Sequence, residues 1–213
     1  MLDSSANRPL ADRLFERITR CATGLALFGI GIACFVCGGL GLAPWDMLHQ
    51  GISKHTDIEL GTIIIIVGLS ILVLWIPLRQ RPGIGTIMNA LEIGLVENIA
   101  QDLLPETRLL VIRVGYVFLG MILVAVGSGL YIGAELGTGP RDGLMVGLHQ
   151  RFGISVRLAR TLVEILAIAI GMLLGGQIGF GTFVFALGIG PLVHVTINWF
   201  KLPEKTSSDS AQS

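Results

Sequence analysis

The sequence predicts an all-α membrane protein with six transmembrane helices, arranged as two inverted three-helix repeats. Three observations lead to this prediction: an apolar composition, six long apolar stretches and a repetition of the sequence. Hydrophobic residues make up 52% of the 213 residues, charged residues make up 14%, and the mean hydropathy is +0.75. Such a composition is too apolar for an ordinary soluble domain.

The apolar stretches predict where the chain crosses the membrane. They cover residues 18–40, 60–78, 84–103, 113–134, 158–176 and 180–200. Each is close to the roughly 20 residues that span about 30 Å of hydrocarbon as a helix. We expect the first stretch to remain as an anchor, because it is longer than the apolar part of a cleavable signal peptide.

The sequence repeats itself at an offset of ninety-six residues without a gap. About twenty identities fall within roughly eighty-six pairs, more than a Gly- and Leu-rich composition gives by chance. The recurring residues include Arg17, Gly24, Gly31, Gly41, Pro44, Asp46, Gly85 and Thr86, which return as Arg113, Gly120, Gly127, Gly137, Pro140, Asp142, Gly181 and Thr182. Since each repeat has an odd number of crossings, the second should be upside down relative to the first, as in many transporters.

These patterns divide the chain into five segments. We expect a cytoplasmic N-terminal tail at 1–16, the first repeat at 17–103, an outside loop at 104–112, the second repeat at 113–200 and a cytoplasmic C-terminal tail at 201–213. This orientation leaves only Lys54, Arg108 and Arg113 outside among the fifteen Lys and Arg residues, in agreement with the positive-inside rule. The Ser-rich end, 206–213, is too polar to order itself.

A glycine, a proline and an aspartate follow the first span of each repeat. The two sequences are Gly41-Leu-Ala-Pro44-Trp-Asp46 and Gly137-Thr-Gly-Pro140-Arg141-Asp142. Glycine lets the chain leave one helix, proline suits the first position of the next, and the aspartate lies near its free amides. We therefore expect short helices at 44–53 and 140–151. Either they enter the membrane and line a common cavity with their carboxylates, or they lie on its surfaces and the aspartates only cap them.

A glycine-rich turn precedes the last span of each repeat. The two turns are Gly83-Ile-Gly85-Thr86 and Gly179-Phe-Gly181-Thr182. Glycine permits a tight turn, and the threonines are well placed to cap the helices that follow. A phosphate-binding loop is the alternative, but the lysine of a P-loop follows neither turn.

Ionisable side chains inside a span cost roughly 2.5–3.5 kcal/mol near its centre, so each needs a partner or a role. Glu92 shares a helical face with Asn89, and Glu164 shares one with Arg160. An internal salt bridge between Glu164 and Arg160 is one interpretation. The other is a proton or cation relay formed by Glu164 and Glu92. Glu97 lies nearer the outer end of its span, where we expect it to reach headgroups or water.

Several classes of function find no support in the sequence. A nucleophile elbow, an HExxH zinc motif and a dinucleotide-binding fingerprint are missing, so we expect no enzyme and no cofactor. Cys34 and Cys37 have the spacing of metal ligands but no second pair, so we interpret them as packing residues and expect no metal site. With a net charge of zero, the chain has no electrostatic footprint for nucleic acid.

A family resemblance covers the chain from about Arg17 to Phe200. It rests on the paired Gly-x-x-Pro-x-Asp motifs and on the second-half motifs Gly137-Thr-Gly-Pro140-Arg141-Asp142-Gly143-Leu144, Leu174-Gly175-Gly176 and Gly188-x-Gly190-Pro191. In these motifs the chain resembles the YczE-like family of bacterial multi-pass membrane proteins, which is related to the YitT-like group. The resemblance implies a bacterial cytoplasmic (inner) membrane location and suggests transport or export of small molecules.

We expect a small secondary transporter or exporter of a small solute, coupled to protons or cations and forming a homodimer. The pathway residues would be Asp46, Asp142, Glu92, Glu164, Asn89, Arg141 and Arg160, with the broken backbone shaped by Gly41, Pro44, Gly137, Pro140, Gly85 and Gly181. The alternative is a membrane scaffold or regulatory subunit that binds a partner protein through its glycine faces. Those faces are Gly24, Gly31 and Gly38 in the first span, and Gly120 and Gly127 in the fourth.

Overall fold

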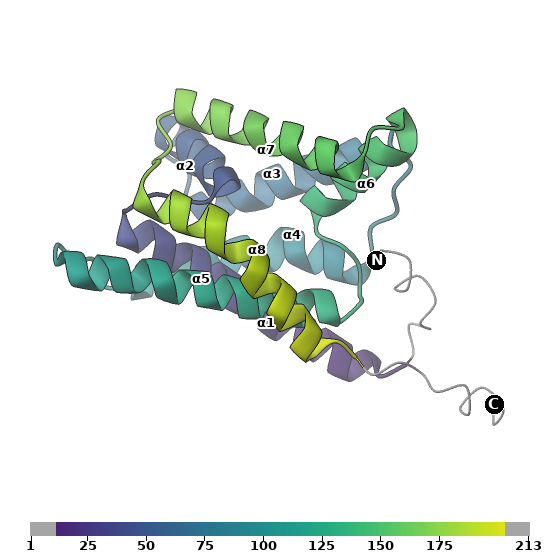
Figure 1. Cartoon of the computed structure of the whole chain (residues 1–213), viewed down its shortest axis with the longest axis horizontal. Coiled ribbons are helices and arrows are strands. Elements are labelled where there is room, and N and C mark those ends of the chain that lie inside the picture. Colours follow the sequence, from purple (N-terminus) through teal and green to yellow (C-terminus); the bar gives the residue numbers. More distant parts are fainter. Residues whose placement is uncertain (1–11, 203–213) are drawn as a thin grey trace.

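Eight helices make up the part of the protein that the computed structural model describes, residues 12–202. They are α1 (Leu14–Gly38), α2 (Pro44–Thr56), α3 (Leu60–Trp75), α4 (Ile84–Leu103), α5 (Leu110–Gly133), α6 (Pro140–Phe152), α7 (Val156–Leu173) and α8 (Phe180–Phe200). α1 and α5 pack together, α4 packs against α1 and α8 crosses α5, while α2, α3, α6 and α7 form the other side of the molecule (Figure 1). Within the described residues the all-α prediction is confirmed.

The helix bounds repeat at the same offset as the sequence. α2 and α6 each have 13 residues, begin at their proline and lie ninety-six positions apart. Proline suits this first position because its missing N–H would have no partner there. α1 begins at Leu14 and α5 at Leu110, so the ends of the predicted tail and outside loop are helical. The prediction for 206–213 lies outside the described residues.

The two longest helices, α1 and α5, pack closely and run antiparallel. Gly24 of α1 meets Gly127 of α5, and Gly31 of α1 meets Gly120. A Cβ atom on Gly24 would lie 2.6 Å from the carbonyl oxygen of Gly127, too close for any side chain. Small residues let helix backbones approach in this way inside a membrane. The glycine faces predicted for the first and fourth spans therefore pack against each other.

Two equivalent arginines close the ends of this helix pair. Arg17 of α1 donates hydrogen bonds to the carbonyl oxygens of Ala134 (2.9 Å) and Glu135 (2.7 Å), where α5 ends. Arg113 of α5 donates in the same way to Gly38 (2.7 Å), where α1 ends. The last carbonyls of a helix lack partners within it, and a cation also complements their partial negative charge. Each repeat thus completes the end of the other's first helix.

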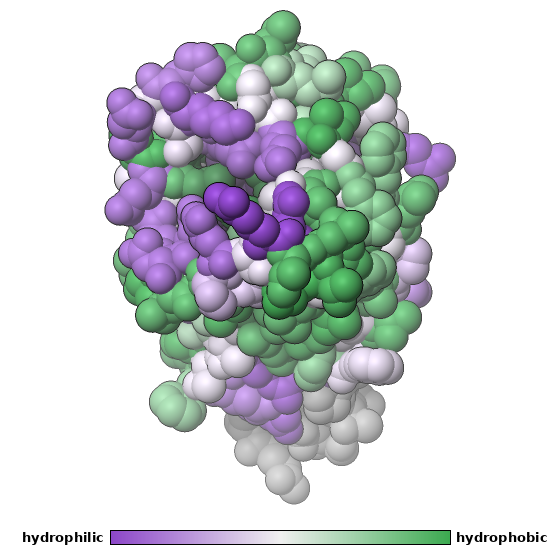
Figure 2. Space-filling model, turned by 90° about the vertical axis from the view of Figure 1, so that its left-hand side faces the viewer, coloured by the Kyte–Doolittle hydropathy of each residue, from purple (hydrophilic) through white to green (hydrophobic). Residues whose placement is uncertain are grey.

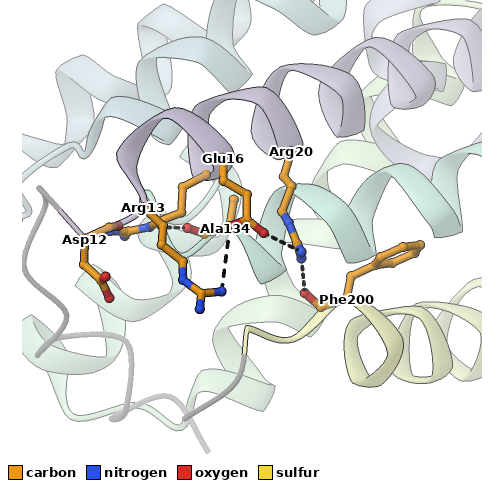
Figure 3. Close-up of polar contacts among 7 residues, drawn as sticks. Asp12, Arg13, Glu16, Arg20, Ala134 and Phe200 are labelled. Carbon is orange, nitrogen blue, oxygen red and sulfur yellow. Dashed lines mark hydrogen bonds and ion pairs between the residues drawn. The ribbon is translucent and has the colours of Figure 1, made fainter. Parts of the chain in front are cut away.

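A third arginine, Arg20, holds the end of α8 against the first turns of α1. Its guanidinium lies 2.7 Å from the Glu16 carboxylate and 3.2 Å from the carbonyl oxygen of Phe200 (Figure 3). Arg13 approaches the same carboxylate at 3.8 Å. The last turn of α8 is therefore tied to α1 by a side chain that is itself anchored within α1.

The loop after the first helix of each repeat is bonded to the turn of the other repeat. The amide of Gly85 donates to the carbonyl oxygen of Leu136 (2.9 Å), between α5 and α6. The amide of Gly181 donates to the carbonyl oxygen of Leu40 (2.8 Å), between α1 and α2. Leu40 and Leu136 are ninety-six residues apart, so the two interactions are equivalent. We call them the interlocked corners.

Glycine is required inside both interlocked corners. Gly41 and Gly137 have φ angles of +114° and +130°, a conformation that other residues rarely adopt. A Cβ atom on Gly41 would also lie 2.5 Å from the amide nitrogen of Gly179. The sequence prediction that glycines shape the broken backbone is consistent with these positions.

The predicted threonine caps are present at the start of α4 and α8. The hydroxyl oxygen of Thr86 accepts a hydrogen bond from the amide of Gly83, and that of Thr182 accepts one from Gly179, both at 3.2 Å. Thr86 also donates to the carbonyl oxygen of Thr138 at 2.7 Å, which adds a further bond across the corner. Capping and docking between repeats are thus combined in one side chain.

The two repeats differ where their last two helices meet. In the first, Gly61 of α3 contacts Gly94 of α4, and the Gly61 amide donates to the side chain of Asn98 (2.7 Å). In the second, the position of Gly61 is taken by Arg157, and a Cβ atom on Gly190 of α8 would meet nothing within 4 Å. α3 therefore packs along α4, whereas α7 and α8 stand apart.

Within the described residues, α1, α5 and α8 are long and apolar enough to cross a bilayer. α2 and α3 also qualify as a bent pair, with an angle of 113° between them. α3 alone has 16 residues, and α4 and α7 contain ionisable side chains, so the six-span count stays a prediction. At one end of the molecule, hydrophilic residues gather in the upper left and hydrophobic residues cover much of the remaining surface (Figure 2).

Replacing Gly127 by alanine should destabilise the protein, because the new Cβ atom would lie 2.9 Å from the backbone nitrogen of Phe28 in α1. We expect a loss of about 1–3 kcal/mol, seen as a lower thermal unfolding temperature of the detergent-purified protein. Gly115→Ala in the same helix is the matched control, since a Cβ atom there meets nothing within 4 Å. Equal unfolding temperatures for the two variants would contradict this assignment.

Candidate functional site

A cavity of about 320 Å³ lies between the two repeats, and all eight helices contribute to its walls. Its volume is at the lower end of the roughly 300–1,000 Å³ typical of small-molecule sites. Most of the lining side chains are apolar, and a few polar or charged groups join them near the N-termini of α2 and α6. This combination is typical of a site that holds a small solute.

The walls of the cavity reflect the repetition of the chain. Twelve pairs of lining residues, twenty-four of the twenty-eight, are ninety-six positions apart. Pro44 and Pro140 form one such pair, and Asp46 and Asp142 form another. The cavity therefore lies where equivalent parts of the two repeats face each other.

The structure brings together most of the residues that the sequence predicts for the pathway. Asp46, Asp142, Glu164, Asn89, Arg141, Arg160, Pro44 and Pro140 all line the cavity. Glu92 does not line it, and Gly41, Gly85, Gly137 and Gly181 lie in the interlocked corners instead. The prediction of a common cavity for both aspartates thus agrees with the geometry, whereas a relay between Glu92 and Glu164 has no support from their placement.

Three charged side chains form a cluster on the α6 and α7 side of the cavity. Arg160 lies 3.2 Å from the Asp142 carboxylate and 3.9 Å from that of Glu164. Their side chains are 58%, 46% and 44% exposed, so the cluster is open to the surroundings. The expected contact between Arg160 and Glu164 is present, but the closer partner of Arg160 is Asp142.

On the α2 side, Asp46 and His49 are buried against the cavity with little support from neighbours. Their side chains are 7% and 1% exposed, and Asp46 Oδ1 lies 3.5 Å from His49 Nδ1. Neither of these atoms has a hydrogen-bond partner, so the contact is too long or too poorly aligned to be a hydrogen bond. An unsatisfied buried polar atom is costly, and such atoms in native structures call for an explanation.

The simple capping interpretation of the aspartates does not fit this arrangement. The Asp46 Oδ1 atom accepts no hydrogen bond from a backbone amide, and the Asp142 Oδ1 atom faces Arg160. Both residues still lie in the first turn of their helices, where the positive end of the helix dipole favours a carboxylate. Each carboxylate is therefore placed by its helix while keeping an oxygen for groups in the cavity.

Arg141 crosses from α6 to α2. Its guanidinium lies over the ring of Trp45, 4.7 Å from the ring centroid, as a cation–π contact. Trp45 and Arg141 are equivalent positions in the two repeats, so the first turns of α2 and α6 meet through this stack. The hydroxyl group of Tyr131, also in the cavity wall, is buried and has no hydrogen-bond partner.

The prediction for Glu97 is wrong, since it does not reach headgroups or water. Glu97 is fully buried on α4, where it packs beside Gly29 of α1, and neither of its carboxylate oxygens has a hydrogen-bond partner. Its charge would interact with those of Asp46, Glu59 and Asp102. Sequence spacing cannot reveal this, because it does not say which face of α4 meets α1.

The described residues contain no group of three or more His, Cys, Asp or Glu side chains that could hold a metal ion. The polar groups of the cavity instead form separate donors and acceptors. Arg141 and Arg160 supply donors, Asp46, Asp142 and Glu164 supply acceptors, and Asn89 can act as either. This set suits recognition of a polar solute by hydrogen bonds and charge.

Comparison with known proteins identifies several proteins with similar sequences. A protein of Haemophilus influenzae is 37% identical over 184 residues, which cover 86% of this chain and 84% of that protein. The membrane protein YczE of Bacillus subtilis is 30% identical over 198 residues, which cover 92% of this chain and 89% of YczE. YyaS of the same species is 24% identical over 176 residues, or 81% and 88% of the two chains. No solved structure matches the chain significantly.

The match to a family covers nearly the whole of the structure described above. Residues 15–198, from the first turn of α1 to the last turn of α8, match the family described as a family of unknown function, DUF6198. The relatives include a membrane protein, in agreement with the apolar helices. The chain therefore belongs to the DUF6198 family of YczE-like membrane proteins.

Proposed function

We propose that the protein is a small secondary transporter, which moves a small solute through the cavity between its two repeats. The observation that carries this proposal is the pairing of equivalent residues across the cavity, with Asp46 facing it from one repeat and Asp142 from the other. Inverted-repeat transporters bind their substrate at the interface between repeats, where broken helices direct their N-termini toward it. The N-terminal turns of α2 and α6 are in the corresponding place.

The proposal includes an inverted arrangement of the two repeats, six membrane crossings and both termini in the cytoplasm. The antiparallel contact of α1 and α5 supports it, because equivalent helices that run in opposite directions give their repeats opposite orientations. α2 and α6 would then enter the membrane from opposite sides as broken segments. Non-helical backbone at that depth is tolerated where protein or a cavity surrounds it, as in the interlocked corners.

The difference between the repeats supports a route into the cavity. Arg160 and Glu164 of α7 line the cavity and remain exposed, and α7 stands apart from α8. In the first repeat, the contact of Gly61 with Gly94 closes the equivalent place between α3 and α4. A transporter needs its two routes to open in turn, with movement of one repeat against the other.

Buried carboxylates support coupling to protons. Glu97 is fully buried without a hydrogen-bond partner, and an unpaired charge in such a place is too costly to keep, so the group should carry a proton. Its charged form would be opposed by that of Asp46 in the cavity wall. A buried carboxylate that exchanges its proton supports coupling between proton movement and solute movement.

The alternative of a scaffold that binds a partner through its glycine faces has less support. Gly24 and Gly31 of α1 are in contact with Gly127 and Gly120 of α5. A partner protein could reach these glycines only by separating the two helices. No enzymatic step forms part of either proposal.

The test of transport uses purified protein in liposomes, an imposed pH gradient and a library of small solutes. We expect a solute-dependent proton flux that Asp142→Asn and Asp46→Asn each reduce by at least about tenfold, because each removes a charge from the cavity wall. Asp57→Asn, an exposed change in the loop after α2, is the matched control and should transport normally. Normal flux through both cavity variants, at equal insertion, would refute the assigned site.

Glu97→Gln should separate solute movement from proton movement. Glutamine has nearly the same shape but cannot exchange a proton, so solute should still equilibrate across the liposome membrane while an imposed pH gradient no longer drives its accumulation. Glu92→Gln, one and a half turns earlier in α4, is the matched comparison. If Glu92→Gln uncouples the flux and Glu97→Gln does not, the relay predicted from the sequence is right and the proposed role of Glu97 is wrong.

A further inference from the structure

Two side chains of opposite charge line the cavity and form no ion pair with each other. Arg141 and Asp46 both line it, and the Arg141 charge would be attracted by the carboxylates of Asp46, Asp142 and Glu164. No ion pair within 4.0 Å joins them among the described residues, and Asp46 Oδ1 has no hydrogen-bond partner. Buried charges are usually paired, because the attraction between them offsets the loss of water. Because both groups line the cavity and do not pair with each other, a solute bound there can contact both of them.

The donor side of this site is held in place. Trp45 covers one face of the Arg141 guanidinium at 4.7 Å, which restrains the side chain without using its N–H groups. Those groups remain directed around the edge of the guanidinium plane, where they can bind the two oxygens of a carboxylate together. Arg160 is not available in the same way, because it already faces Asp142 at 3.2 Å.

The acceptor side is buried and equally restrained. Asp46 is buried and lies in the first turn of α2, one residue after Trp45. Its Oδ1 atom has no partner, although His49 lies only 3.5 Å away. An ammonium group in the cavity would supply the charge and the hydrogen bond that this oxygen lacks.

The rest of the cavity wall is apolar and suits a hydrocarbon group. Phe35 and Phe185 pack edge to face, 5.7 Å between centroids, and both line the cavity together with Ile64 and Ile93. Since the whole volume is about 320 Å³, the solute must be small. A molecule with two opposite charges at one end and an apolar group at the other would meet all three parts of the wall.

We propose that the substrate of this site is a small zwitterion with an apolar side chain, of the size and chemistry of an aliphatic amino acid. Its carboxylate is bound by Arg141, its ammonium group by Asp46, and its side chain by the apolar wall formed by α1, α3, α4 and α8. The identification of this zwitterion as a transported substrate rests on the proposed transport function. Binding of the zwitterion can be measured without transport.

The experiment measures binding of three matched probes to the detergent-purified protein by isothermal titration calorimetry. The probes are leucine, 3-methylbutylamine, which lacks the carboxylate, and 4-methylpentanoate, which lacks the amine. We expect leucine to bind at least about tenfold more tightly than either other probe, because a hydrogen bond to a charged group contributes about that much to affinity. Weaker binding of leucine than of either probe, equal binding or none at all would overturn the proposal.

Two variants assign the two charged interactions, and a purely structural role would not reproduce their pattern. Arg141→Gln should remove the preference for leucine over 3-methylbutylamine and leave binding of the amine within about threefold. Asp46→Asn should remove the preference over 4-methylpentanoate in the same way. If each variant instead weakens all three probes alike, Arg141 and Asp46 only maintain the fold and the proposal fails.

The same measurements separate this inference from the proposed transport function. Selective binding of leucine without any solute-dependent flux would keep the zwitterion site and refute the transporter. Flux of solutes other than zwitterions, together with no selective binding of leucine, would keep the transporter and refute the zwitterion site.

Discussion

The close contact of α1 with α5 determines where the rest of the protein can lie. Glycines bring the two backbones together at Gly24–Gly127 and Gly31–Gly120, and the α4 and α8 helices then pack on the outer sides of this pair. In a membrane the hydrophobic effect does not hold helices together, so such packing and the hydrogen bonds at helix ends must do so. The arrangement brings the first turns of α2 and α6 together in the wall of the cavity.

Much of the architecture was predictable, because hydrophobic stretches and repetition are properties of the local sequence. α4 and α8 occupy the predicted residues, 84–103 and 180–200, and both short helices begin at the predicted prolines. The burial of Glu97 was not predictable, since it depends on a contact with Gly29 from a distant part of the chain. The stack of Arg141 on Trp45 was missed for another reason: equivalent positions hold different residues there, so a search for identities passes over them.

Departures from the repeat carry as much information as the identities. The exchange of Gly61 for Arg157 replaces the smallest residue by one of the largest, and it occurs where the two repeats differ in packing. Asn89 and Phe185, which line the cavity from equivalent positions, likewise differ in polarity. A symmetric frame thus holds a site whose equivalent positions differ in polarity.

The interlocked corners also impose an order on the synthesis of the protein. The carbonyl oxygen of Leu40 is bonded by Gly181, which leaves the ribosome more than a hundred residues later. Until Gly181 is synthesised, the carbonyl oxygen of Leu40 in the loop between α1 and α2 lacks this hydrogen bond, and lipid cannot supply one. In contrast, Gly85 has already been synthesised when Leu136 leaves the ribosome, so their hydrogen bond can form at once. During membrane insertion, the corner formed by Gly85 and Leu136 should therefore close first. The corner formed by Leu40 and Gly181 should close only when α8 is inserted.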